Sequence, residues 1–189
     1  IVKVEDYTHF EVIGRTRDDA AGECYDKAAR AMGMPYPGGV ALDKLAHEGD
    51  PKAFPLPRPR VEGSEYDFSF SGLKTAVINH LNTLSQKDIP YNRADVAASF
   101  TQAVVSSVVK KLDMALRRTG ETKLVIAGGV AANSHIRNAL DDYCKKHTNI
   151  RLYLPEKKLC GDNGAMIAAQ AYFEYLAGVR GDTTLNARA

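Results

Sequence analysis

Cysteine is scarce in this sequence, and the three cysteines, Cys24, Cys144 and Cys160, are widely spaced and form no C-x-x-C pair. An odd number of isolated cysteines argues against a disulfide framework or a zinc knuckle. It favours a reducing compartment, so we expect a cytoplasmic protein. The apolar runs are all far shorter than the ~20 residues that a membrane helix needs. We therefore expect no membrane partner.

A strong excess of one charge is also lacking, because 25 basic and 23 acidic residues leave a net charge of +2. This balance gives no global argument for nucleic-acid binding, although a local basic face remains possible. Lys52, Arg58, Arg60 and Lys74 flank a proline-rich stretch and are the candidates for such a face. With 44% hydrophobic and 25% charged residues among 189, the composition is that of one globular domain or a piece of a larger protein.

Common catalytic motifs are missing as well. The sequence has no Walker loop, no G-x-S-x-G elbow and no H-E-x-x-H or H-x-x-x-H pair. The histidines are His9, His47, His80, His135 and His147. Their spacing matches no metal-binding pattern, so we expect no histidine-based metal site in this chain.

Hydrophobic periodicity and turn residues predict an α/β fold. The expected strands cover residues 1–5, 9–15, 67–71, 123–127 and 150–154, and the expected helices cover about 18–32, 40–47, 73–84, 94–118, 131–146 and 162–176. The first two strands form a hairpin, and the last third forms a βαβα unit with a parallel strand pair. We expect Thr16 or Asp18 to cap the first helix and the alanine-rich last helix to be buried.

The stretch K-L-V-I-A-G-G-V-A-A-N, residues 123–133, is a buried strand that leads through Gly128-Gly129 into a helix. Glycines at the carboxyl end of a parallel strand let the backbone approach a ligand closely. Asn133 can present its amide to a base, ribose or phosphate. A tight turn with a solvated Asn133 explains the same residues about equally well.

Two further stretches carry candidate ligand-binding residues. In D-D-A-A-G-E-C-Y-D-K, Asp18 and Asp26 share a helix face, and a mid-helix Asp26 suits a pair of hydroxyl groups. In P-Y-P-G-G-V-A-L-D, Gly38-Gly39 allows close contact, and Asp43 looks back toward the loop. A wet helix face at Asp26 and an ordinary loop before the next helix are the alternatives.

Two helix starts are informative. Lys74, in D-F-S-F-S-G-L-K-T, lies in a first turn where it opposes the helix dipole, so either a nearby anion or plain exposure explains it. Asp162, in C-G-D-N-G-A-M, precedes the last helix. By itself it is typical of a helix cap.

Together, in this order, R-D-D-A-A-G-E-C-Y-D-K, Y-P-G-G, D-F-S-F-S-G-L-K-T, A-G-G-V-A-A-N and D-N-G-A-M-I-A closely resemble the tRNA threonylcarbamoyladenosine transferases, the TsaD family. The resemblance covers residues 1 to about 179 and looks like the bacterial branch. It implies an actin/Hsp70-like fold with two RNase H-like lobes. It also implies transfer of threonylcarbamoyl from threonylcarbamoyl-AMP to the tRNA adenosine 3′ of the anticodon.

Matched motif by motif, the resemblance implies adenylate contacts and one metal ligand. Asp26, Gly38, Gly39, Asp43, Gly128, Gly129 and Asn133 match the nucleotide-binding positions. Asp162 matches the aspartate that ligates a catalytic Fe2+ or Zn2+ ion, which would polarise the carbamoyl oxygen. The implied partners are tRNA, a paralogous scaffold protein and a small ATPase.

The sequence departs from the family in lacking its His-x-x-x-His pair and its Ser-Gly-Gly-His-Thr turn, which lie upstream in the family. Residues 1–189 are therefore expected to be the C-terminal lobe, without its first strand. We expect this chain alone neither to bind metal tightly nor to transfer threonylcarbamoyl. A non-catalytic scaffold paralogue, the metallopeptidase of an older family label and an ATP phosphotransferase of the same superfamily are the alternatives.

Overall fold

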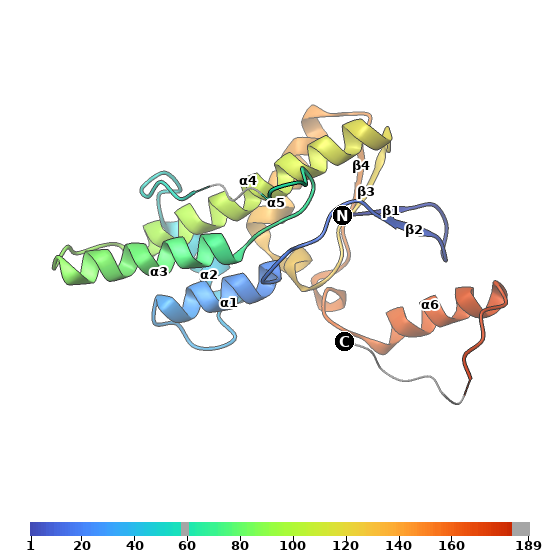
Figure 1. The fold of residues 1–189 in the computed structure, drawn as a ribbon, viewed down its shortest axis with the longest axis horizontal. Coiled ribbons are helices and arrows are strands. Elements are labelled where there is room, and N and C mark those ends of the chain that lie inside the picture. The colour runs from blue at the N-terminus through green and yellow to red at the C-terminus, as the bar shows by residue number, and fades with distance from the viewer. Residues whose placement is uncertain (58–60, 183–189) are drawn as a thin grey trace.

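The structure, a computed structural model, describes residues 1–57 and 61–182. Helices α1 to α5 form the body of the molecule, and one short hairpin and helix α6 extend to one side of it (Figure 1). Two small two-stranded sheets accompany the helices, so the expected α/β class is confirmed. Arg58 and Arg60, two of the candidate basic residues, lie outside the described residues.

The expected N-terminal hairpin is present. Strand β1 (Val2–Val4) pairs antiparallel with β2 (Phe10–Val12), and Val2 lies opposite Val12. Asp6 closes the turn, because its carboxylate accepts hydrogen bonds from the backbone amides of residues 8 and 9. The periodicity of the sequence therefore located this element correctly.

Helix α1 (Ala21–Ala31) ends before Gly33, as predicted, but its expected capping was wrong. Ala20 occupies the N-cap position and makes no side-chain hydrogen bond to the helix. The hydroxyl of Thr16 donates to the Asp19 carbonyl instead. The next helix, α2 (Gly39–Leu45), continues as the 3-10 turn η1 (Ala46–Glu48), in agreement with the predicted short helix.

Asp18 caps a different helix from the expected one. Its carboxylate accepts from the amides of Phe70 and Ser71 at 2.8 and 3.1 Å, where α3 (Ser71–Gln86) begins. The strand expected at residues 67–71 was wrong, because only Phe68 forms a bridge, with Thr16. A lone bridge leaves this segment without a sheet to extend.

Helix α4 (Arg93–Thr119) is the long helix that the sequence predicted. The side chain of Asn92 caps its start by accepting from the amide of Ala94, and Gly120 ends it with a φ of 70°. Glycine adopts this left-handed conformation without the steric cost of a Cβ. Upstream, Phe54 and Leu56 of the proline-rich stretch pack partly against the core, so this stretch is irregular but not wholly exposed.

The predicted parallel pair is present in the last third. Strand β3 (Lys123–Val125) pairs with β4 (Arg151–Tyr153) in parallel, and helix α5 (Ser134–Lys146) crosses between them. The turn η2 (Gly129–Ala132) precedes α5, which therefore begins three residues later than expected. A further 3-10 turn, η3 (Lys157–Leu159), follows β4.

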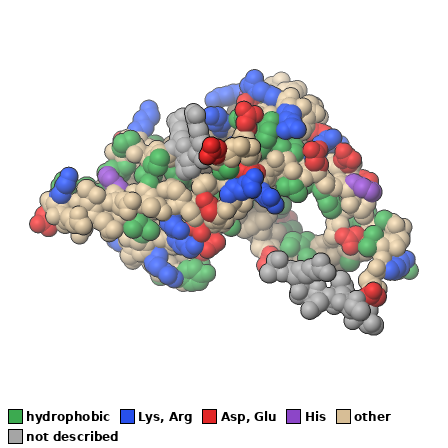
Figure 2. Space-filling view, viewed as in Figure 1, with side chains coloured by type: hydrophobic (Ala, Val, Ile, Leu, Met, Phe, Trp, Pro, Cys, Tyr) green, Lys and Arg blue, Asp and Glu red, His purple; other side chains and the backbone are tan. Residues whose placement is uncertain are grey.

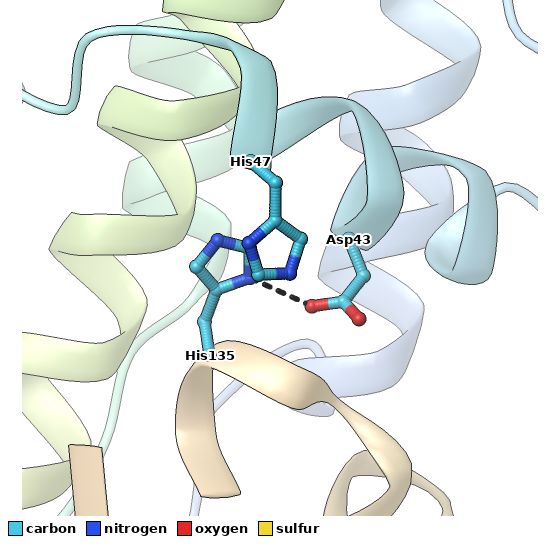
Figure 3. Close-up of side chains that lie close together, drawn as sticks. All are labelled: Asp43, His47 and His135. Carbon is cyan, nitrogen blue, oxygen red and sulfur yellow. Dashed lines mark hydrogen bonds and ion pairs between the residues drawn. The ribbon is translucent and has the colours of Figure 1, made fainter. Parts of the chain in front are cut away.

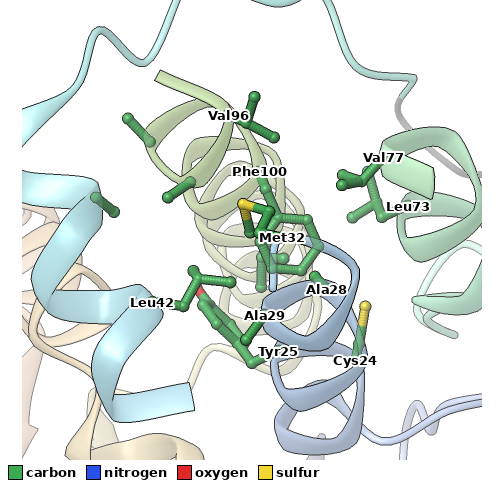
Figure 4. Packing of buried hydrophobic residues seen from close by; sticks show 14 of the residues in the cluster. Cys24, Tyr25, Ala28, Ala29, Met32, Leu42, Leu73, Val77, Val96 and Phe100 are labelled. Atoms are coloured by element: carbon green, nitrogen blue, oxygen red, sulfur yellow. The ribbon is translucent and has the colours of Figure 1, made fainter. Parts of the chain in front are cut away.

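Two apolar clusters hold the body together. The first joins α1, α2, α3 and the N-terminal half of α4, with Phe100 fully buried and in edge-to-face contact with Tyr25 (Figure 4). The second joins the C-terminal half of α4 to α5 and the β3–β4 sheet around Leu140. Because α4 contributes to both clusters, it links the predicted ligand-binding loops into one body.

Helix α6 (Gly164–Leu176) contradicts the expectation of a buried helix, since none of its residues is buried. Its contact with the hairpin runs through Tyr7, whose ring stacks on Phe173 at 3.7 Å. An apolar helix is buried only if another surface faces it, and among residues 1–57 and 61–182 the hairpin turn is the surface that contacts α6. Within the described ranges, no helix combines the length and the apolar character needed to cross a bilayer.

Candidate functional site

Asp26 and the Gly38-Gly39 turn form one hydrogen-bonded unit. One oxygen, Oδ1 of Asp26, accepts from the amides of Gly38 and Gly39 at 2.9 and 2.8 Å. Gly38 is sterically required, because a Cβ there would overlap the side chain of Ala29. The mid-helix carboxylate therefore fixes the start of α2, which explains its position on α1.

This geometry corrects one expectation for Asp26. Asp18 does not share a helix face with it, since Asp18 precedes α1 and binds the start of α3. The neighbouring Lys27 is partly exposed, and its ammonium pairs with Asp19 and Glu23 at 2.8 and 2.6 Å. The Oδ2 atom of Asp26 makes no hydrogen bond with a described residue, so one carboxylate oxygen can accept a hydroxyl group.

Gly128 and Asn133 shape the loop between β3 and α5. Gly128 has a φ of 83° and a ψ of 173°, a conformation essentially confined to glycine, and nothing lies within 4 Å of a Cβ placed on it or on Gly129. Asn133 is the N-cap of α5, because its side-chain oxygen accepts from the amide of Ile136 at 2.9 Å. The loop is open, but the Asn133 oxygen already has a partner.

Asp43 connects α2 to the start of α5. Its carboxylate accepts from the amide of Ser134 at 3.1 and 3.2 Å and contacts Nδ1 of His135 at 2.9 Å. It therefore faces α5 and not the preceding loop, contrary to the expectation. Burial raises the pKa of Asp43, but the hydrogen bonds from His135 and Ser134 outweigh it and leave the pKa below its ordinary value.

Two histidines that the sequence-based search dismissed lie beside Asp43. His47 and His135 stack at 3.9 Å between ring centroids, and the carboxylate of Asp43 lies next to the rings (Figure 3). One ligand atom from each of the three side chains lies within 4.8 Å of the other two. The D-x-x-x-H spacing of Asp43 and His47 on one helix was the available signal, and a search for histidine pairs alone misses it.

Asp162 lies apart from these residues. It is exposed, and it makes no hydrogen bond or ion pair with any described residue that would hold its carboxylate in place. Asn163 caps α6 by accepting from the amide of Met166 at 3.0 Å, so the alternative role of Asp162 as a helix cap was wrong. Among the described residues, Asp162 belongs to no group of three potential metal ligands.

The anionic partner of Lys74 is a carboxylate of the same chain. Its ammonium lies 2.8 Å from a carboxylate oxygen of Asp19, which also binds Lys27. This internal ion pair accounts for a lysine in the first turn of α3, and the side chain is only partly exposed. Its charge is partly neutralised and contributes less to a basic face.

The structure thus brings most of the candidate residues to one place, where α1, α2 and the start of α5 meet. Asp26 contacts the Gly38-Gly39 turn, and Asp43 contacts the residue that follows Asn133. Gly22 of α1 faces Val130 of the loop, which places Gly128-Gly129 at the same junction. A groove of about 1160 Å³ lies elsewhere, along α4, and none of these residues lines it.

A model of the tRNA N6-adenosine threonylcarbamoyltransferase family, TsaD, matches residues 1–169. The chain belongs to this family. The match spans every predicted motif from the first hairpin into α6, including Asp26, Asp43, Asn133 and Asp162. The resemblance found in the motifs is therefore confirmed.

Curated relatives support the same family assignment. A tRNA N6-adenosine threonylcarbamoyltransferase of Staphylococcus epidermidis is 49% identical over 186 residues, which cover 98% of this chain and 54% of the relative. The protein of the same name from Caldicellulosiruptor saccharolyticus is 47% identical over 187 residues, 99% of this chain and 55% of the relative. The chain spans about half the length of the curated relatives it matches.

A solved structure shares the fold. The crystal structure of HypF from T. kodakarensis superposes with a TM-score of 0.62 and 21% identity, over 85% of this chain and 20% of that protein. At this identity the likeness concerns the fold alone. It is compatible with the α/β class of the TsaD chain.

Proposed function

We propose that the protein containing this TsaD chain transfers a threonylcarbamoyl group from threonylcarbamoyl-AMP to N6 of the tRNA adenosine 3′ of the anticodon. The family match over residues 1–169 carries this proposal. The relatives are named for transfer to N6 of adenosine, and the residues that would hold an adenylate meet at one junction in the chain.

The reaction requires the exocyclic amine to attack the carbamoyl carbon of a mixed anhydride. The new bond joins N6 to that carbon, the bond from the carbon to the phosphate oxygen breaks, AMP leaves with the electron pair, and N6 loses a proton. Because this amine is a weak nucleophile, positioning of the anhydride is a large part of catalysis. We assign that positioning to the junction of α1, α2 and α5.

Each residue at the junction has a part in this assignment. The free oxygen of Asp26 and the carboxylate of Asp43 are acceptors for sugar hydroxyls, since an ionised carboxylate offers about four lone-pair sites. The open Gly128-Gly129 turn admits the adenosine without a Cβ in the way. Asn133 keeps its amide NH2 group for the nucleotide while its oxygen caps α5.

For the proposed Fe2+ or Zn2+ ion, the described residues supply one ligand, Asp162. Asp162 offers an exposed carboxylate, and the described residues supply no second ligand beside it. Residues 1–57 and 61–182 therefore do not supply a complete metal site at Asp162. If Asp162 ligates the ion, the other ligands belong to another part of the protein.

We further propose that residues 1–189 form the second lobe of an actin/Hsp70-like protein, and that tRNA, a paralogous scaffold and a small ATPase are its partners. The fold shared with HypF supports the lobe assignment only at the level of architecture. On the face in Figure 2, basic and acidic side chains are interspersed, so a tRNA surface there would rely on local contacts and not on one basic patch.

The test is complementation of cells that lack their own transferase, with threonylcarbamoyladenosine in tRNA measured by mass spectrometry. The full-length protein is expected to restore the modification. Asp43→Asn should reduce the transfer rate about tenfold to a hundredfold, because a charged hydrogen bond contributes about 1.5–3 kcal/mol. Asp141→Asn, which removes an exposed α5 carboxylate paired with Lys145, should leave it unchanged. A correctly folded wild-type protein that modifies no tRNA would refute the proposal.

A further inference from the structure

Asp43, which the proposed adenylate site also uses, forms a cluster with His47 and His135, and the adenylate site does not explain these two histidines. We propose that these three side chains bind a divalent transition-metal ion, with Zn2+ as the best fit, at a site distinct from Asp162. Two imidazole nitrogens and a carboxylate oxygen are brought within 4.8 Å of one another from two elements far apart in the sequence. The proposal stands independently of the transferase reaction.

The backbone holds the three ligands in place. Asp43 and His47 are four residues apart on α2 and its continuation η1, so both project from one side, while Leu42 and Ala46 are buried against the core. His135 lies in the first turn of α5, which Asn133 caps and which the bond from Ser134 to Asp43 ties to α2. The ligands therefore stand on packed elements and not on a loose loop.

The present contacts would need only small changes to admit an ion. His135 Nδ1 lies 2.9 Å from Asp43, and His47 Nε2 lies 2.7 Å from the hydroxyl of Ser134. Four-coordinate zinc has ligands at about 2.0–2.2 Å, so its ligand atoms lie roughly 3.4 Å apart. An ion would replace the proton shared by Asp43 and His135, and His47 would turn from Ser134 by a rotation that its exposed position permits.

The donor set selects the metal. Imidazole suits zinc and its transition-metal neighbours, whereas Mg2+ and Ca2+ prefer sites made of oxygen alone. Two histidines with one carboxylate leave a fourth position open to water or a ligand oxygen. The exposed side of His47 places that open position toward solvent.

A second Asp–His pair shows what the cluster adds. In the hairpin, His9 Nδ1 lies 2.8 Å from Asp6, a distance similar to that between His135 and Asp43. No third potential ligand joins the pair among the described residues. If an Asp–His ion pair alone were enough to bind Zn2+, loss of His9 from the hairpin pair would weaken Zn2+ binding as much as loss of His135.

The experiment uses the full chain without an affinity tag, stripped of metal with a chelator. Titration with Zn2+ by calorimetry, and with Co2+ by its visible absorption bands, should show a single high-affinity ion per chain. His47→Gln and His135→Gln should each weaken binding by about tenfold or more, since even removal of a residue that only supports a ligand costs about tenfold to a hundredfold. His47 is exposed, so its variant should keep the wild-type circular dichroism spectrum.

The matched controls are His9→Gln and Asp162→Asn, which should bind both ions as the wild type does. Three results would overturn the proposal: no saturable Zn2+ binding, unchanged affinity in both the His47 and His135 variants, or loss of binding in Asp162→Asn alone. Because metal affinity is measured without tRNA or adenylate, these outcomes are independent of the proposed transferase activity.

Discussion

Helix α1 is less apolar than α6 but is more deeply buried. Helix α1 contains charged residues in almost every turn but buries four residues, Cys24, Tyr25, Ala28 and Ala29. Helix α6 has a single charged residue, Glu174, and buries none. The difference lies in what faces each helix: α1 packs against α2 and α3, whereas α6 contacts the hairpin turn and packs against no other helix in the part of the chain that the structure describes.

This comparison separates hydrophobicity from burial. An apolar side chain contributes stability only when a second surface removes it from water. The apolar stripe of α1 faces its neighbouring helices α2 and α3, whereas the apolar residues of α6 are spread around most of the helix and no helix covers them among the described residues. We therefore expect substitutions in the body to change global stability and equivalent substitutions in α6 to change it little.

The largest effect is expected from truncation of a core phenylalanine. Phe100→Ala removes a fully buried ring and should lower the free energy of unfolding by about 3–5 kcal/mol. Phe173→Ala, on α6, leaves a half-exposed position and should cost less than about 1 kcal/mol. Urea unfolding followed by circular dichroism measures both. Equal losses would show that α6 is part of the cooperative core.

A smaller effect is expected from an added methyl group. A Cβ on Gly49 would overlap the backbone carbonyl of Ala94 at the start of α4, so Gly49→Ala should cost about 1–3 kcal/mol. Gly164→Ala, at the first position of α6, meets nothing within 4 Å and should be neutral or slightly stabilising. Thermal unfolding of the two variants distinguishes them, and a stable Gly49→Ala protein would contradict the tight contact between η1 and α4.

The asparagine caps of α5 and α6 test the same contrast at about 1 kcal/mol, the usual cost of losing a helix cap. Asn133→Ala should lower global stability, because α5 belongs to the packed body. Asn163→Ala should leave the global transition unchanged and speed hydrogen exchange only within α6, since a helix without buried residues opens on its own. Slower exchange in α6 than in α5 would argue against this description.

The smallest expected effect is the pH dependence of stability that Asp18 contributes. Burial raises the pKa of Asp18, but hydrogen bonds from Ser69, Ser71 and Phe70 outweigh it and hold the pKa below its ordinary value. The stabilisation is therefore present above about pH 4, the ordinary range of an aspartate, and is lost as the pH falls through the lower pKa of the folded state.

Asp18→Asn should accordingly reduce stability by about 0.5–1 kcal/mol at neutral pH, a typical value for such capping bonds, and match the wild type in acid. Urea titrations at several pH values give the comparison. Asp162→Asn is the control, because its exposed carboxylate holds no described partner. A constant difference between Asp18→Asn and the wild type at every pH would contradict the role of the carboxylate charge.

Local features were predictable because they depend on neighbours a few residues away. The hairpin, the long helix α4 and its end at Gly120, and the parallel strands around α5 follow from periodicity and turn residues. The motifs also sufficed to identify the family. Helix caps were less predictable, because Asn163 and Asp162 are neighbours of similar capping ability and only one has the required geometry.

The partners of the carboxylates could not be predicted. Asp18 binds amides more than 50 residues away, and Asp43 meets His135 across 92 positions. Which polar groups meet over such distances depends on how the helices pack, and no pattern in one segment reports it. The same reason hid the His47–His135 pair, whose members belong to different helices.

The sequence by itself determined the family and the α/β class, because short motifs and periodicity express local backbone chemistry. Tertiary structure alone decided which apolar helix is covered and which carboxylate is free. Burial and hydrogen bonding need a second surface at contact distance, and only the folded chain supplies it. Asp26 and Asp43 therefore became parts of a packed junction, while Asp162 stayed exposed.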